Sequence, residues 1–350
     1  MRKLFFTSIS VALAVSALAG PANNPKLQSY LEQTLTLCPE AQTVLETVDV
    51  QGPKHFDAYR ITMTSSVENC RERSFALHSP SSGQVIAGQI IPLEPSPDST
   101  AEKIQELLDT RMKLEAESKI LDEDLPDGVK RVKITKTSPS GDVTLYGYLD
   151  ESEQFFILGR RGNLSEDPKT TLFDSLDVEN AASRGPKNAR VEIVELSDFQ
   201  CPACGRAHEI LEPYVQKYGD QIRYLRLDLP ITDHHPWAMK AALGARAIEK
   251  VAPRHYWSYV DYIFENQSNI TADSIDQVVR DFVEGTGIDW KTFQRYYESP
   301  SERSRLNRQT GRAFENNIFA TPTILVNGRP LFYGENGSGL EAHLKQLFGE

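Results

Sequence analysis

The chain has 350 residues, of which 39% are hydrophobic and 25% are charged. This composition excludes a disordered or collagen-like polypeptide and leaves room for two domains. The formal net charge of −11 argues against nucleic acid and anionic membrane surfaces as partners.

Residues 1–19 are predicted to be a cleaved signal peptide. Arg2 and Lys3 precede a mostly apolar run that extends from Leu4 to Leu18, and Ala17-Leu18-Ala19 has the small-x-small pattern of a cleavage site. The alternative is a retained membrane anchor, but the run is shorter than the roughly 20 apolar residues that a membrane span needs. We therefore expect a periplasmic or secreted protein in an oxidising compartment.

Residues 21–175 are predicted to form an α+β domain, because helix-like and strand-like periodicities alternate along them. A run of charged residues with apolar positions at helical spacing predicts a long helix over 100–120. The other elements expected here are a helix over 27–37 and strands over 59–64, 74–78, 84–91, 129–135, 143–149 and 154–158.

This N-terminal region contains two similar segments about 73 residues apart. The sequence Ile61-Thr62-Met63-Thr64-Ser65 is similar to Ile134-Thr135-Lys136-Thr137-Ser138, and each follows a predicted helix and precedes two predicted strands. A tandem duplication with units of about 21–97 and 98–175 would explain the match, and chance similarity between short segments remains the alternative.

Small residues, glycine and proline predict a linker over 176–189, and residues 190–350 read as a second domain of α/β class. Its predicted order is a buried strand, a helix, a second strand, a helical insertion over about 231–311, a strand pair and a final helix. The strand pair spans 323–333, with its turn at Asn327-Gly328.

The motif Cys201-Pro202-Ala203-Cys204 lies where the first of these strands passes into a helix. A helix N-terminus stabilises a thiolate and can lower a thiol pKa from about 8.5 to roughly 3.5–7.5. The second thiol, one turn later, can then resolve a mixed disulfide. Two alternatives are a zinc site, which needs four ligands, and a structural disulfide, which constrains little chain over so short a loop. We expect no metal and no cofactor.

The segment from Val191 to Cys204 resembles the active-site segment of the DsbA-like branch of the thioredoxin superfamily. The segment Ala320–Gly328 resembles the cis-proline loop of that family, and the likeness continues through Trp237–Ala242 and Phe264–Gln267. It covers about residues 186–348. The resemblance implies a thioredoxin fold with an inserted helical domain, and dithiol–disulfide exchange on protein substrates.

The resemblance also implies roles for individual residues. Cys201 would be the nucleophile and Cys204 the resolving thiol, while Pro322 would follow a cis peptide bond and face both cysteines. The alternative for this proline is an ordinary trans bond before a strand. The residues expected to contact substrate are Thr321, Pro202 and Ala203.

Glu195 occupies the position of the family's buried acidic residue, which exchanges a proton with the resolving thiol. A carboxyl group in a buried strand can act as a general base. The alternative is a glutamate at a strand edge that faces solvent.

The dipeptide between the cysteines departs from the family pattern, because the strongest oxidants carry Pro-His where this chain has Pro202-Ala203. One source of thiolate stabilisation is therefore missing, and the direction of exchange stays open. His208, one turn after Cys204, could face the site or be a solvated helix histidine, and His234-His235 reads as a polar pair in a loop.

In the N-terminal half, the segment Ser79–Gly88 resembles a strand–turn–strand unit of the DsbC-type dimerisation module. This implies contact with partners or substrates and leaves a homodimer open. We also predict a structural disulfide between Cys38 and Cys70, which would close a loop of about 30 residues and contribute about 3 kcal/mol. The alternative is a free or intermolecular thiol.

The leading hypothesis is an exported thiol–disulfide oxidoreductase that acts mainly as an oxidase. The alternatives are a DsbC-like isomerase or reductase, a substrate-binding chaperone or assembly factor, and a reductant dedicated to one client. The expected partners are exported protein substrates and a membrane redox protein of the DsbB or vitamin K epoxide reductase type.

Overall fold

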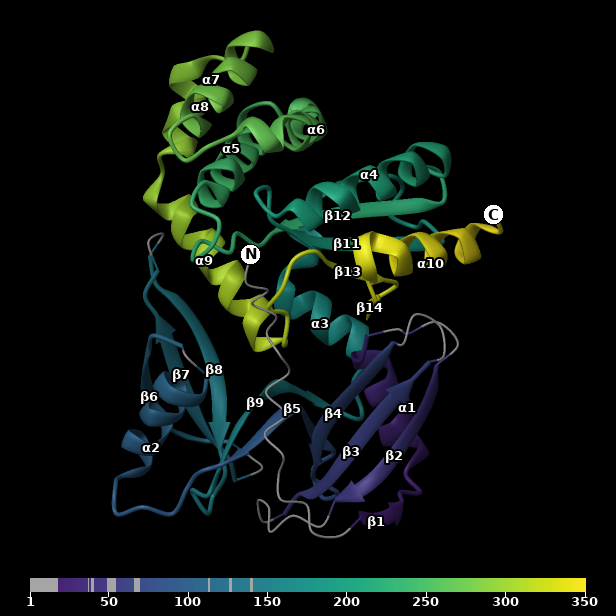
Figure 1. The fold of residues 1–350 in the computed structure, drawn as a ribbon, viewed down its shortest axis with the longest axis vertical. Coiled ribbons are helices and arrows are strands. Elements are labelled where there is room, and N and C mark those ends of the chain that lie inside the picture. Colours follow the sequence, from purple (N-terminus) through teal and green to yellow (C-terminus); the bar gives the residue numbers. More distant parts are fainter. Residues whose placement is uncertain are drawn as a thin grey trace.

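The computed structural model describes residues 18–36, 38, 41–48, 55–65, 70–112, 114–125, 128–138 and 141–350. The predicted signal peptide lies outside the described residues except for positions 18 and 19, which belong to strand β1 (Leu18–Pro21). An N-terminal β-rich region and a C-terminal α/β domain lie one above the other (Figure 1). Within the described residues, every helix is too short or too polar to span a bilayer.

The described N-terminal residues form a nine-stranded sheet in which neighbouring strands are antiparallel. The strand order is β1-β2-β3-β4-β5-β9-β8-β7-β6. After β1, the strands are β2 (Gln42–Val48), β3 (Asp57–Thr64), β4 (Arg71–His78), β5 (Gln84–Pro92), β6 (Ala116–Asp124), β7 (Lys130–Lys136), β8 (Val143–Leu149) and β9 (Phe155–Asn163).

The same order of elements occurs twice in this sheet. Helix α1 (Pro25–Thr34) precedes β2 to β5, and helix α2 (Thr100–Glu106) precedes β6 to β9. The last strand of each set, β5 and β9, pair with each other in the middle, so the two sets run outward in opposite directions (Figure 1). A tandem duplication would produce this arrangement, and the duplication remains a prediction.

Glycines allow the two central strands to approach each other. Gly88 lies directly opposite Gly159 in the β5–β9 register. A Cβ atom on Gly88 would lie 2.3 Å from the backbone oxygen of Leu158, and a Cβ on Gly159 would lie 2.4 Å from that of Ala87. Any larger residue at either position would push the strands apart.

The prediction of one long helix over 100–120 is wrong. Helix α2 ends at Glu106, one further turn covers Leu107–Arg111, and residues from Ala116 onward form the outermost strand β6. Ala116 is buried whereas Glu117 and Lys119 are exposed. Charged residues on an edge strand discourage pairing with other chains, but they also give the segment the composition of a solvated helix.

The C-terminal domain contains a five-stranded sheet in the order β10-β12-β11-β13-β14. The central strand β11 (Val191–Ser197) is parallel to β12 (Ile222–Asp228) and antiparallel to β13 (Thr323–Val326). Strand β10 (Ala182–Arg184) lies within the predicted linker and pairs with β12, so part of that segment extends the sheet. The strand β14 (Arg329–Pro330) forms the other edge.

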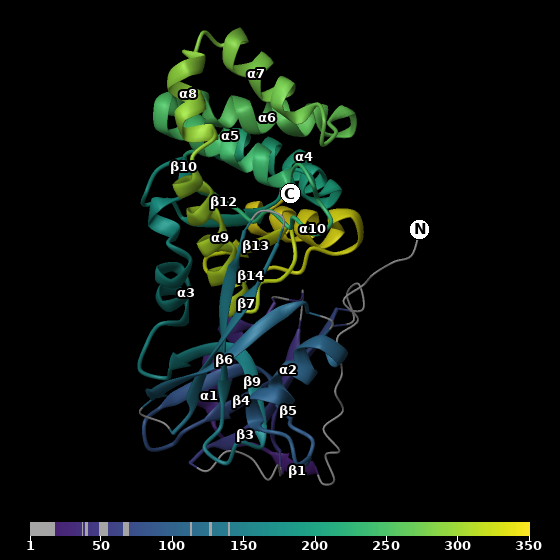
Figure 2. The same ribbon diagram turned by 90° about the vertical axis from the view of Figure 1, so that its left-hand side faces the viewer.

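Helices surround this sheet and form the expected insertion, so the predicted thioredoxin fold with an inserted helical domain is confirmed. Helices α5 to α8 lie beyond α4, on the side away from the N-terminal sheet (Figure 2). The helices are α3 (Pro168–Leu176), α4 (Pro202–Lys217), α5 (Ala238–Val251), α6 (Tyr256–Asn266), α7 (Ile275–Gly285), α8 (Trp290–Tyr297), α9 (Pro300–Glu315) and α10 (Ser338–Phe348).

Helix α9, the last helix before β13, packs against β8 of the N-terminal sheet (Figure 1). Gly311 makes this close contact possible, because a Cβ atom there would lie 2.1 Å from the backbone oxygen of Thr144. Just after the helix, Asn317 Nδ2 donates a hydrogen bond of 3.0 Å to the backbone oxygen of Ala87. The segment that leads into β13 is therefore anchored to the centre of the N-terminal sheet.

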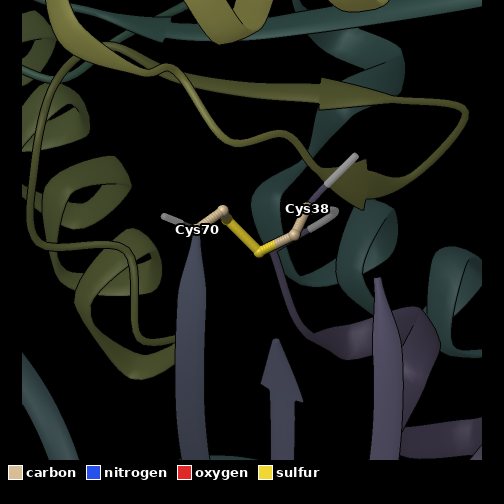
Figure 3. Close-up of a disulfide and its surroundings, with 2 residues drawn as sticks. All are labelled: Cys38 and Cys70. Atoms are coloured by element: carbon tan, nitrogen blue, oxygen red, sulfur yellow. A yellow bond between two sulfur atoms is a disulfide. The ribbon is translucent and has the colours of Figure 1, made fainter. Parts of the chain in front are cut away.

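A disulfide joins Cys38 to Cys70, the pairing expected from the sequence (Figure 3). Both cysteines are buried in an apolar cluster against which Phe332, just after β14, also packs. Nearby, Arg329 Nη2 donates a hydrogen bond of 2.9 Å to the backbone oxygen of Glu32. The Cys38–Cys70 disulfide thus lies where the first half of the N-terminal sheet meets the C-terminal domain.

Candidate active site

Cys201 and Cys204 lie at the start of α4, directly after the loop that follows the central strand β11. Cys201 is the N-cap residue of the helix, and Pro202 occupies the first helical position, where its missing N–H costs no hydrogen bond. Both cysteines are free thiols. Cys201 retains 8% of its surface exposed whereas Cys204 has none, so only the first thiol is accessible from solvent.

The pKa of Cys201 is lowered to about 6, chiefly by its hydrogen bond with the thiol of Cys204. Thr321 and the backbone N–H groups of Cys204 and Ala203 lower the pKa further, while burial opposes them. These N–H groups belong to the first turn of the helix, whose N-terminus favours a negative charge. Cys201 therefore exists largely as a thiolate at neutral pH.

Burial raises the pKa of the Cys204 thiol well above its usual value, and the negative charges of Cys201 and Glu195 add to the effect. The backbone N–H of Asp198 donates to Cys204 Sγ at 3.4 Å and partly opposes it. The two thiols are thus chemically unequal, although only two residues separate them.

The peptide bond between Thr321 and Pro322 is cis, and the Thr321 carbonyl oxygen accepts a hydrogen bond from Cys201 Sγ at 3.4 Å. The alternative of a trans proline is therefore wrong. Thr321 and Pro322 are half-buried, as is Ala203, whereas Pro202 is exposed. Of the residues predicted to contact substrate, Thr321 therefore touches Cys201 directly, while Pro202 and Ala203 follow it in the chain.

One exposed aromatic side chain next to this loop was not predicted. Phe319 lies three residues before Pro322, has 36% of its surface exposed, and packs on Phe314 with ring centroids 5.5 Å apart. An exposed large apolar side chain beside a reactive site commonly marks a binding surface. Nothing in the local sequence pattern separates this phenylalanine from a core residue.

Glu195 is fully buried in β11, so the alternative of a solvent-facing glutamate is wrong. The Tyr224 hydroxyl donates a hydrogen bond to its Oε2 atom. Its other oxygen, Oε1, accepts no hydrogen bond from the described residues. Because Glu195 raises the pKa of Cys204, its carboxylate is electrostatically coupled to the resolving thiol, as the predicted proton exchange requires.

A glutamine from the helical insertion holds the cysteine loop in place. Gln267 Nε2 donates to the backbone oxygens of Phe199 at 2.7 Å and Cys201 at 3.0 Å. From the loop itself, Gln200 Oε1 accepts a hydrogen bond of 2.7 Å from the backbone N–H of Trp237. The insertion therefore fixes the position of the nucleophile, a role for which the sequence offered only the family-like segment that contains Gln267.

The adjacent histidines of the 231–237 loop differ in their surroundings. His234 is exposed, whereas His235 Nδ1 lies 2.7 Å from Oδ2 of the buried Asp198. The hydrogen bond to Asp198 raises the pKa of His235, and the charge of Cys201 raises it further. The interpretation of both residues as a loop polar pair therefore holds for His234 alone.

His208 is buried, which contradicts its interpretation as a solvated histidine. Its Nε2 atom lies 3.0 Å from Asp261 Oδ1, and its ring stacks on Phe264. His208, Asp261 and Glu212 bring potential metal-ligand atoms within 4.8 Å of one another. Glu212 also pairs with Arg184, so this cluster is already engaged in ion pairs.

A cavity of about 500 Å³ lies elsewhere, between α3, α5 and α9. Its lining is rich in basic side chains and includes none of the cysteine-loop residues. These basic residues are Arg246, Lys250, Arg305, Arg308 and Arg312.

Residues 177–345 match the family model described as Thioredoxin. This region is similar to thioredoxin-family domains. It is similar to the probable disulfide bond formation protein D of Bacillus cereus, with 27% identity over 42% of this chain and 69% of that protein. The chain is also 29% identical to the Na(+)/H(+) antiporter NhaA 3 of Salinispora tropica over 51% of its own length. It spans only about a quarter of the length of that antiporter.

Two solved structures are similar to about half of the chain. BdbD from Bacillus subtilis is 21% identical, with a TM-score of 0.43 over 49% of this chain and 95% of that one. The catalytic domain of Proteus mirabilis ScsC is 18% identical, with a TM-score of 0.42 over 52% of this chain and 98% of that one.

Proposed function

We propose that this protein is an exported thiol–disulfide oxidoreductase that transfers disulfides to protein substrates through Cys201 and Cys204. The observation that carries the proposal is the opposite displacement of the two thiol pKa values, lowered to about 6 for Cys201 and raised for Cys204. A pair of this kind supplies an accessible nucleophile and a protected resolving thiol. Similarity to a disulfide bond formation protein supports the same chemistry.

In the oxidising direction, a substrate thiolate attacks Cys201 Sγ of the Cys201–Cys204 disulfide. The sulfur–sulfur bond of the domain breaks, a mixed disulfide forms with the substrate, and Cys204 leaves and takes up a proton by way of Glu195. A second substrate thiolate then attacks the substrate sulfur, and Cys201 leaves as a thiolate. The substrate loses two electrons, which the two domain cysteines gain.

The lowered pKa of Cys201 favours oxidation of substrates over their reduction. A stabilised thiolate stabilises the reduced form of the domain, and this makes its disulfide a stronger oxidant. Re-oxidation would then be performed by a membrane redox protein of the DsbB or vitamin K epoxide reductase type. An isomerase of the DsbC type, which must be kept reduced, is the second candidate because the N-terminal sheet offers a further contact surface.

The surface around Pro202, Thr321 and Phe319 is proposed to bind an extended segment of the substrate. Pro202 and Phe319 are exposed, and the Thr321 carbonyl oxygen contacts the Cys201 thiol at 3.4 Å. We assign partner or substrate contact to the N-terminal sheet. A homodimer formed through this sheet is the proposal that sedimentation would test.

Export is proposed from the apolar segment within residues 1–19. The Cys38–Cys70 disulfide supports it, because structural disulfides persist in oxidising compartments.

A glutathione equilibrium titration of the full chain tests the direction of exchange. We expect a reduction potential closer to that of strong oxidants, about −120 mV, than to that of reductants, about −270 mV. The protein should also oxidise a reduced, unfolded substrate protein. A strongly reducing potential, combined with activity only on scrambled disulfides, would replace the oxidase with an isomerase. A folding effect that survives Cys201→Ser would favour a chaperone.

A further inference from the structure

His235 is held in one orientation by the loop that carries the cysteines. Its Nδ1 atom lies 2.7 Å from Asp198 Oδ2, and this carboxylate also accepts hydrogen bonds from the backbone N–H groups of Gln200 and Ile231 at 2.7 and 2.8 Å. Asp198 has 1% of its surface exposed. A carboxylate in contact with an imidazole favours the protonated form of that imidazole.

The backbone of the same aspartate contacts both cysteines. The Asp198 carbonyl oxygen accepts a hydrogen bond of 3.1 Å from the Cys201 N–H, and the Asp198 N–H donates to Cys204 Sγ at 3.4 Å. One residue therefore ties the imidazole of His235 to the dithiol. The side chain of His235 remains 20% exposed, so its protonation follows the pH of the solvent.

Two arginines of the described residues, Arg206 and Arg226, have partners of their own. The residues between the cysteines, Pro202 and Ala203, carry no charge. Arg206, one turn into α4, is exposed and pairs with Glu209 at 2.8 Å. Arg226 is buried over the ring of Phe199 and pairs with Asp228.

The thiolate of Cys201 raises the pKa of His235. An electrostatic interaction between two groups is mutual, so a charged imidazole must favour the thiolate to the same extent. The charged groups that face His235 are Asp198 from the loop after β11 and Cys201 from the start of α4. Asp233, two residues before His235 in the chain, forms an ion pair with Lys136.

We propose that His235, oriented by Asp198, is a positioning residue whose imidazolium stabilises the thiolate of Cys201. It supplies from a separate loop the positive charge that the Pro-Ala dipeptide lacks. The inference rests on the proposed exchange function and adds a pH-sensitive group to it. Its contribution is present between the pKa of Cys201, about 6, and the raised pKa of His235, and it is lost as the pH rises through the latter.

The same charge acts at the step in which Cys201 leaves. When a substrate thiolate attacks the mixed disulfide, the Cys201–substrate bond breaks and its electron pair remains on Cys201 Sγ. The imidazolium stabilises this leaving group without giving up its proton, so the electron balance of the exchange is unchanged. The disulfide form carries no thiolate, and the interaction with His235 then disappears.

The direct test is the titration of the His235 ring by nuclear magnetic resonance in the intact protein, once reduced and once with the Cys201–Cys204 disulfide formed. We expect a higher pKa for His235 in the reduced protein, with the exposed His234 unchanged between the two states. Equal His235 pKa values in both states would overturn the proposal. This measurement needs no variant and no protein substrate.

The substitution His235→Asn removes the charge but keeps a side-chain donor for Asp198. We expect the Cys201 thiolate to titrate at higher pH, and the equilibrium constant for oxidation of glutathione by the domain disulfide to fall about three- to tenfold. His234→Asn is the matched control and should change neither quantity. His235→Lys should restore thiolate stabilisation and extend it to higher pH, which a purely structural role of His235 would not do.

These readouts separate the inference from the proposed function. Thiolate titration and glutathione equilibrium report on His235 whether or not the protein oxidises protein substrates. If wild type and His235→Asn give the same thiolate titration, the role of His235 is refuted and the exchange function stands. If the thiolate titration and the glutathione equilibrium both differ between wild type and His235→Asn, but the wild type oxidises no protein substrate, the exchange function fails. The His235–Cys201 interaction then still stands.

Discussion

The N-terminal sheet and the thioredoxin domain each hold one pair of cysteines, and the surroundings of the two pairs differ. Cys38 and Cys70 are joined across 32 residues within an apolar cluster. Cys201 and Cys204 are free thiols at a helix N-terminus, where the hydrogen bond between them lowers the pKa of Cys201 and burial raises the pKa of Cys204. The comparison teaches that the environment of each pair, rather than the presence of two cysteines, separates a structural bond from a reactive one.

The largest effect should come from Cys201→Ser, which removes the nucleophile. We expect complete loss of disulfide exchange, measured as oxidation of a reduced peptide, because the thiol of Cys204 is buried and protonated. The matched control is the double substitution Cys38→Ser and Cys70→Ser, which should retain exchange in the folded protein. Activity in Cys201→Ser, or its loss in a folded control, would break the comparison.

The second difference is in thiol reactivity after mild reduction. Cys201 should be alkylated with a pH profile centred near 6, whereas an ordinary thiol would give a midpoint near 8.5. Cys204 should react slowly throughout, because it is buried and its pKa is raised. Mass spectrometry of the labelled peptides measures both rates. A Cys201 midpoint near that of a free thiol would contradict the proposed environment.

Removing the structural bond should affect stability instead of chemistry. The substitutions Cys38→Ala and Cys70→Ala should lower the free energy of unfolding by about 3–4 kcal/mol, because the unfolded chain regains the entropy of a long loop. Urea unfolding of the non-reduced protein measures this quantity. The corresponding change at Cys201 and Cys204, whose disulfide closes only a very short loop, serves as the control and should change stability less.

The smallest expected effect is on the proton transfer at Cys204. Glu195→Gln should slow exchange about tenfold near neutral pH while leaving the protein at least as stable, because a buried carboxylate is costly. The matched control is Glu192→Gln on the same strand, where the carboxylate pairs with Arg223 and Lys169. If Glu195→Gln exchanges disulfides at the wild-type rate between about pH 6 and pH 8, Glu195 takes no part in the proton transfer.

Local sequence patterns were sufficient to predict much of the secondary structure of the thioredoxin domain. The strand before Cys201, the helix after it and the helical insertion each have their own hydrophobic periodicity, so they could be read from the sequence. The resemblance to the DsbA-like branch supplied Glu195 and Pro322, which the structure places in the strand and the loop next to the cysteines. Even the repeated order of elements in the N-terminal sheet had a trace in the similar segments at Ile61 and Ile134.

Features that depend on long-range contacts could not be predicted. His235 contacts Asp198 only because the loop after β12 folds back over the loop after β11, and no periodicity reports that approach. Gln267 reaches the cysteine loop from the far end of α6 for the same reason. Strand β6 was missed because its identity comes from pairing with β7, which outweighs the helix-like composition of its own residues.

The pairing of β5 with β9 has a consequence for assembly. Because both halves of the sheet belong to one polypeptide, their association is intramolecular and does not weaken on dilution, unlike the association of two separate chains. The covalent connection also fixes the stoichiometry. After β9 the chain continues through α3 into a thioredoxin domain, whereas after β5 it continues only into α2. Each chain therefore carries two similar sheet halves but only one thioredoxin domain, so the two halves are free to differ from each other in sequence.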